Sequence, residues 1–211
     1  MRHSTTSALF TYWDSVRGYR LAPQRFEIDP SRISAILPYT FILERRDAET
    51  FTFRLAGTRM CDIFGHELRG INFLDGWQAI DRLPLLRQFS TLTRHATAGV
   101  VNLEIGAADE APVECEVLLL PLRHTRDTIE RVLGSFSPLS SPDWLGEKPV
   151  VSKRVITSDV VWPSRDPHSA IARPIEPPSI DPSRSARIVR SQRRQFQVFE
   201  GGLSNADPDK T

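Results

Sequence analysis

The sequence has few cysteines and no long apolar run, and both absences limit the class of protein. Its two cysteines, Cys61 and Cys115, stand far apart without the CxxC or Cys/His spacing of a metal site. We therefore expect no disulfide framework and no zinc site, which suits a reducing cytoplasm. The N-terminus has no apolar run of signal-peptide length, and no stretch reaches the roughly 18 apolar residues of a membrane helix.

An excess of charge of either sign is also absent. The 27 basic and 26 acidic residues give a formal net charge of +1, so no overall field favours nucleic acid or a membrane surface. With 211 residues, of which 40% are hydrophobic, the chain can bury one good core, or one core and a tail.

Motifs that carry catalytic chemistry are missing too. The sequence contains no GxSxG, Walker loop, GxGxxG or DxDxDG, and His66 is not followed by the second histidine of a zinc-protease helix. No nucleophile–base pair is visible, although such pairs can be distant along the chain. An enzyme that uses an apolar pocket is therefore kept only as an alternative.

Residues 51–73 form the stretch around which the rest of the chain is organised. Apolar residues alternate over residues 51–56, which predicts a strand with one buried face. Thr58 is expected to cap a short helix, and Gly65 and Gly70 are expected to form the turns after it, because glycine adopts backbone conformations that other residues avoid. The apolar side of that helix consists of Met60, Ile63 and Phe64.

This stretch resembles a known family through its pieces FRLAGT, FG and LRGINF. They resemble the PAS sensory domain, in particular bacterial proteins that carry one PAS domain and little else, and the resemblance covers residues 9–138. It implies a sheet and short helices that enclose a small-molecule pocket. It also implies a non-enzymatic sensory or protein-interaction role in bacterial signalling, with another signalling protein as partner.

Further elements flank the central stretch. Asp29 and Pro30 are expected to open a short helix that Pro38 stops, before a strand over residues 39–45. Asp81 is expected to cap the clearest amphipathic helix, which Gly99 closes. Three more strands are predicted at 100–106, 112–122 and 129–136. This order predicts an α+β domain with a PAS-like, five-stranded antiparallel sheet and short helices on one face.

The strand near residues 117–122 is apolar on both faces, so both faces need cover. An N-terminal helix with Leu9, Trp13 and Val16 at helical spacing is the natural cover for the second face. Two interpretations of this helix stay open. It is either a lid on the core alone or also the contact that forms a homodimer.

The composition changes at Pro138, since ten of the sixteen prolines lie from there on. We therefore expect a domain over residues 1–138 and a mostly disordered Pro/Ser/Arg-rich tail over 139–211. Within the tail, residues 195–200 have short strand character. Five arginines between Arg184 and Arg194 leave a nucleic-acid binder as a further alternative, which a strong salt dependence of binding would favour.

The candidate residues for a pocket rest on the family resemblance and are otherwise simply a core. They are Phe53, Met60, Phe64, Phe73, Phe89, Leu103, Ile105, Val117 and Leu119. His66 or His95 could ligate haem iron, although an isolated histidine is more often a surface residue. Cys61 could attack a flavin, but it lacks the sequence context of photosensory relatives. The sequence thus indicates neither haem nor flavin, and no metal site.

Overall fold

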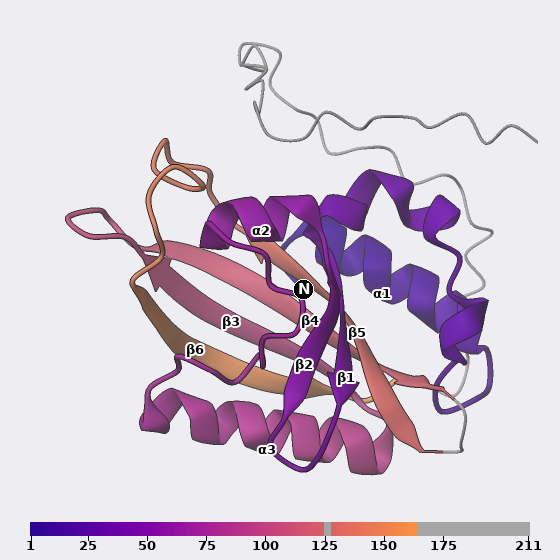
Figure 1. The fold of residues 1–211 in the computed structure, drawn as a ribbon. Helices are drawn as coiled ribbons and strands as arrows, with labels where there is room; N and C mark the ends of the chain where they lie inside the picture. The colour runs from indigo at the N-terminus through magenta and orange to yellow at the C-terminus, as the bar shows by residue number, and fades with distance from the viewer. Residues whose placement is uncertain (125–127, 164–211) are drawn as a thin grey trace, which may run out of the picture. The chain divides into compact units, whose positions relative to one another are not determined.

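A six-stranded antiparallel sheet forms the centre of the structure, a computed structural model that describes residues 1–124 and 128–163 (Figure 1). The strands are β1 Thr40–Arg45, β2 Phe51–Ala56, β3 Ala98–Gly106, β4 Val113–Arg123, β5 Ile129–Pro138 and β6 Ser152–Val161. Their order across the sheet is β2-β1-β5-β4-β3-β6, and every neighbouring pair is antiparallel. The predicted α+β class with an antiparallel sheet is confirmed.

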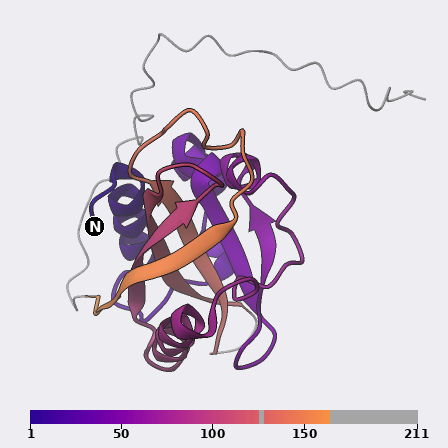
Figure 2. The ribbon, with the colours of Figure 1, turned by 90° about the vertical axis from the view of Figure 1, so that its left-hand side faces the viewer.

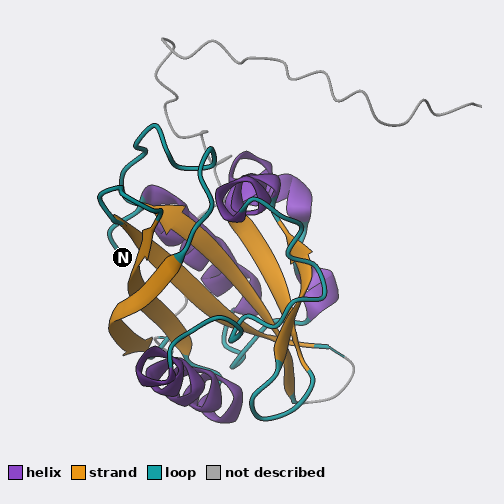
Figure 3. Ribbon diagram, turned by 60° about the vertical axis from the view of Figure 1, so that its left-hand side comes forward, coloured by secondary structure: helices purple, strands orange, loops and turns teal. Residues whose placement is uncertain are grey.

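Three helices precede β1 along the chain, and two more lie between β2 and β3. They are α1 Ser4–Arg17, η1 Arg25–Glu27, η2 Pro30–Tyr39, α2 Thr58–Phe64 and α3 Ala79–His95. Asp29 caps η2 as expected, because its carboxylate accepts a hydrogen bond from the Ser31 N–H at 2.9 Å. Long loops connect α2 to α3 and β5 to β6 (teal in Figure 3).

The N-terminal helix α1 packs on β4 and β5, as the two apolar faces of β4 predicted (Figure 2). Leu9 and Trp13 are fully buried, and Val16 is partly buried against the same core. The Trp13 indole N–H donates to the Pro121 carbonyl at 3.0 Å. The helix is therefore part of the domain, and it ends at Gly18, whose φ of 57° suits glycine.

The start of α1 is held by Glu116 of β4. Its carboxylate accepts hydrogen bonds from the backbone N–H groups of Arg2 at 2.6 Å and His3 at 3.0 Å. Burial raises the pKa of Glu116, but these N–H groups and the N-terminal ammonium outweigh that effect and leave the pKa below its ordinary value. The carboxylate thus fixes the first turn of the helix to the sheet.

The residue before α2 corrects one prediction. The helix is capped by Gly57 rather than Thr58, and no side chain caps it. A Cβ at Gly57 would lie 2.2 Å from the Pro38 carbonyl oxygen, so this close approach of two backbones requires glycine. Gly65 ends the helix in the left-handed conformation, with φ of 73°, as predicted.

The long helix α3 differs from the prediction at both ends. It starts after Gln78 and ends at His95, so neither Asp81 nor Gly99 is a cap. Asp81 is instead buried in the first turn, where its carboxylate accepts a hydrogen bond from the Val155 N–H of β6 at 2.9 Å. Gly99 belongs to β3, where any Cβ would collide with the side chain of Gln88. Both residues therefore serve the contact between α3 and the sheet.

The sixth strand is the main departure from the expected fold. β6 pairs with β3 from Ala98↔Val161 to Gly106↔Ser152, so the sheet has six strands and not five. The loop before β6 also buries Trp144 and Leu145. The sheet thus continues past the domain edge that we expected near Pro138. The arginine-rich segment and residues 195–200 lie outside the described residues.

Candidate ligand-binding site

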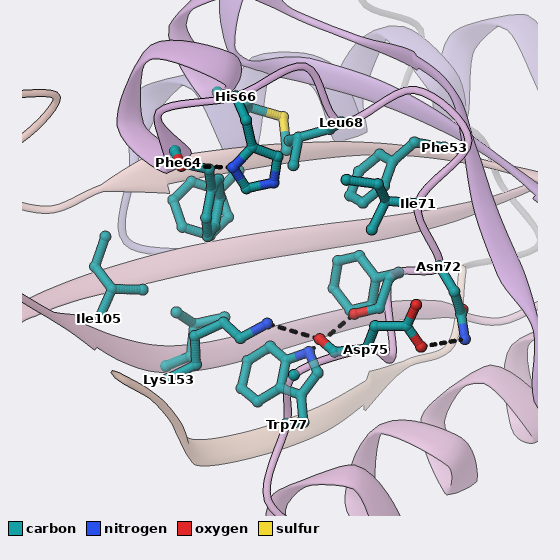
Figure 4. Close-up of a pocket in the computed structure, with 15 residues that line it drawn as sticks. Phe53, Phe64, His66, Leu68, Ile71, Asn72, Asp75, Trp77, Ile105 and Lys153 are labelled. Carbon is teal, nitrogen blue, oxygen red and sulfur yellow. Dashed lines mark hydrogen bonds between the residues drawn. The ribbon is translucent and has the colours of Figure 1, made fainter. Parts of the chain in front are cut away.

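A cavity of about 270 Å³ lies between the sheet and the chain that connects β2 to α3 (Figure 4). Its floor comes from four strands and consists of Phe53, Leu103, Ile105, Phe136 and Lys153. Its cover comes from α2 and the following loop and consists of Met60, Phe64, His66, Leu68, Ile71, Asn72, Phe73, Asp75, Gly76 and Trp77. The floor thus combines β2 and β6, the two opposite edges of the sheet, which means that the sheet curves around the site.

The structure brings most of the predicted pocket residues to this cavity. Phe53, Met60, Phe64, Phe73, Leu103 and Ile105 line it. Phe89, Val117 and Leu119 do not, because they are fully buried in the core. Phe89 lies behind the lining, with its ring 5.5 Å from that of Phe73 and stacked at 4.0 Å on Phe51. That any of these residues binds a ligand stays a prediction.

The loop that covers the cavity, residues 65–77, is bound to the outer edge of β2. Phe53 N–H donates to the Ile71 carbonyl at 2.9 Å, and Phe73 N–H donates to the Phe51 carbonyl at 2.8 Å. Gly70 N–H donates to the Phe53 carbonyl at 2.8 Å. Backbone pairing therefore sets the positions of Ile71 and Phe73 over the cavity.

Lys153 of β6 connects the other edge of the sheet to the same loop. Its ammonium donates to the Asp75 carbonyl at 2.8 Å and lies over the Trp77 ring, 5.0 Å from the ring centre (Figure 4). The Trp77 indole N–H in turn donates to the Phe73 carbonyl at 2.9 Å. Burial lowers the pKa of Lys153, and the nearby charge of Asp75 opposes that shift. Lys153 was not among the predicted pocket residues, because it lies in the segment that we expected to be a tail.

Three other polar side chains lie at the cavity. His66 has its Nδ1 2.8 Å from the Phe64 carbonyl oxygen, so in the neutral ring with Nδ1 protonated, Nε2 is an acceptor. The Asn72 side chain accepts from the Phe51 N–H at 3.0 Å and donates to the Asp75 carboxylate at 3.2 Å. These bonds shape the loop itself, and sequence spacing gave no signal for them.

The residues considered for cofactors are distributed differently. His66 lines the cavity, whereas His95 is elsewhere, with its ring 5.9 Å from that of Trp162. Cys61 is free and does not line the cavity; its sulfur lies 3.8 Å from a Glu67 carboxylate oxygen, so it is not placed to attack a flavin there. Burial raises the pKa of the Cys115 thiol. Within residues 1–124 and 128–163, no group of His, Cys, Asp and Glu side chains is placed to hold a metal ion.

The helices bear on two further expectations. In the described part of the chain, no helix is both long and apolar enough to cross a membrane.

Leu9 and Trp13 are fully buried within their own chain. Self-association through α1 stays a prediction, and it would need side chains other than these two.

Comparison with known proteins places this fold in a family. No curated protein matches the chain. One similar solved structure is described as "Structure of RsLOV D109G", where the residue number belongs to that protein. The similarity has a TM-score of 0.38 and 16% identity, and it covers 57% of this chain and 75% of that one. A family model described as PAS domain matches residues 1–137, which is well over half of the chain. The match runs from α1 into β5, and the chain therefore belongs to the PAS domain family.

Proposed function

We propose that this protein is a non-enzymatic sensor that binds a small molecule in the cavity and passes the change to another signalling protein. Membership of the PAS family makes it a sensory or signalling domain. The cavity supports the finer proposal, because it combines an apolar lining with a few convergent polar groups, as small-molecule sites do. We further propose that the protein is cytoplasmic, since its two free cysteines suit a reducing compartment, and bacterial, as the resemblance to single-PAS-domain proteins implies.

The covering segment, residues 58–77, is the element that we expect to respond. It contains a short helix between Gly57 and Gly65, and such helices belong to the least stable part of a domain. The floor, by contrast, is part of a continuous hydrogen-bonded sheet. A ligand that contacts both would shift the population of the cover by the difference in its affinity for the loose and ordered states.

The response can be measured by hydrogen exchange on protein with and without bound small molecules. Residues 58–75 should exchange faster than residues 113–122 of β4 when the cavity is empty, and they should slow when it is filled. Small molecules that co-purify from the host would be identified by mass spectrometry after denaturation. Ile105→Phe is the comparison variant, because it places a larger side chain on the cavity floor.

A compound enriched with the wild type and not with Ile105→Phe is the expected result. Equal exchange in the two segments, together with no enriched compound, would refute the proposed small-molecule sensor. It would leave a protein-interaction scaffold as the function.

A further inference from the structure

Lys153 is a cation on the wall of an otherwise largely apolar cavity, and the protein groups that its ammonium contacts directly carry no negative charge. The ammonium contacts the Asp75 carbonyl oxygen and the Trp77 ring. Among the residues that the structure describes, no carboxylate oxygen lies within 4.0 Å of its nitrogen. The Asp75 carboxylate instead accepts a hydrogen bond from Asn72 at 3.2 Å (Figure 4).

The ammonium therefore has unused capacity to bind. It carries three N–H donors, and the Asp75 carbonyl takes one of them. The Lys153 side chain is half-buried, so its ammonium is partly removed from water without a charged partner, which is unfavourable. Lys153 lines the cavity, so a ligand there can supply the missing partner without any rearrangement of the sheet.

The remaining lining limits the chemistry of such a ligand. Lys153 is the sole lysine or arginine among the described residues that line the cavity, and the lining also includes Asp75, whose carboxylate is bound by Asn72. One negative charge is therefore the most that the lining can match, which excludes a doubly charged phosphate. Aromatic and aliphatic side chains, including Phe53, Ile71 and Phe136, surround the rest of the space. A volume of about 270 Å³ lies at the small end of ligand sites, which suits a single ring or a short chain.

We propose that the cavity binds a small monocarboxylate whose carboxylate pairs with Lys153 and whose compact apolar body packs on the aromatic lining. This inference rests on the proposed function of the cavity as a ligand site. It also concerns a residue beyond the family match, because the match ends at residue 137 and Lys153 lies on β6. A hydrogen bond from an ammonium to a carboxylate is stronger than one to a neutral carbonyl, so the N–H groups that Asp75 does not use would hold the ligand carboxylate firmly. The ligand would then be joined to β6 and, through the Asp75 carbonyl, to the covering loop.

Phenylacetate and phenylacetamide test the proposal, because they have nearly the same size and shape and differ in charge. Titration calorimetry would measure both with the wild type, Lys153→Met and Lys153→Arg. Lys148→Met is the matched control, since Lys148 is exposed and pairs with Glu110 away from the cavity. The wild type and Lys148→Met should bind phenylacetate about tenfold or more tightly than phenylacetamide. Lys153→Met should lose that preference and keep its affinity for the amide, and Lys153→Arg should retain part of the preference.

The comparison on the wild type alone decides whether the cavity prefers a carboxylate, and Lys153→Arg tests the role of Lys153 if Lys153→Met does not fold. Equal affinities for the two compounds would overturn the carboxylate inference and leave a small-molecule cavity. A preference that survives in folded Lys153→Met would overturn the role of Lys153. If the wild type binds neither compound, the inference fails, and the hydrogen-exchange and co-purification results then decide the proposed sensor separately.

Discussion

Replacing Trp13 by alanine should destabilise the domain strongly, because this side chain fills the interface between α1 and the sheet. Trp13 is fully buried, its ring lies 5.9 Å from that of Phe10, and the Arg17 guanidinium lies 5.5 Å from its centre. Truncation of a buried tryptophan costs about 3–5 kcal/mol. Part of that loss comes from the Pro121 carbonyl, which is left without its indole donor. Trp13→Phe keeps most of the packing and loses the donor, so its expected cost is about 1–3 kcal/mol.

Urea denaturation would measure these free energies. With a slope of about 2 kcal/mol per molar urea, Trp13→Ala should lower the midpoint by about 1.5–2.5 M. Trp162→Ala is the matched control, because Trp162 is 66% exposed and its loss should change stability by no more than about 0.5 kcal/mol. Native mass measured alongside tests the expected homodimer. If Trp13→Ala leaves the midpoint unchanged, then α1 does not act as a cover of the core, which would refute the role assigned to Trp13.

Two further predictions concern the edge strand β6 and the contact of Glu116 with the start of α1. A chain of residues 1–163 should keep the stability of the full chain, whereas residues 1–138 should unfold more easily, because they lack β6 and the buried Trp144. Limited proteolysis and thermal melts would show this, and equal stability of the two fragments would contradict it. The pKa of Glu116 is lower in the folded state than its ordinary value of 4.5, so its carboxylate stabilises the folded state at pH values above 4.5. This contribution is lost as the pH falls through the folded-state pKa. Glu116→Gln should therefore lower the free energy of unfolding by about 1–3 kcal/mol at pH 7, and the two proteins should differ little below the folded-state pKa. A difference in unfolding free energy that does not change with pH would refute this prediction.

The sequence predicted the elements whose physical demands are local. The apolar run over residues 117–122 required cover on both faces, and α1 supplies it with Leu9 and Trp13. Likewise, the alternation over residues 51–56 and the glycine at position 65 placed β2 and the end of α2. Each of these predictions needed only the spacing of apolar residues along one element or the conformational preference of one residue.

The parts that were missed depend on contacts between distant segments. β6 is an edge strand with mostly exposed side chains, so its residues lack the apolar alternation of a half-buried strand. Its prolines and serines nearby resemble a linker when averaged along the chain. Asp81 is a residue type that often caps helices, but its carboxylate instead accepts a hydrogen bond from Val155 of β6, 74 positions away. Lys153 could be identified as a cavity residue only after β6 had been placed in the sheet.

The position of β6 as the last strand along the described chain has a consequence for synthesis of the protein. When β5 leaves the ribosome, the edge of β3 is still unpaired, and its buried positions include Val101, Leu103 and Ile105. Exposed apolar strand edges are sites where chains associate with one another. At about 5–20 residues per second, synthesis from the end of β5 at Pro138 to the end of β6 at Val161 takes roughly 1–5 seconds. The edge of β3 thus lacks its partner strand during that interval, and a chain stopped after β5 would present that edge to its neighbours.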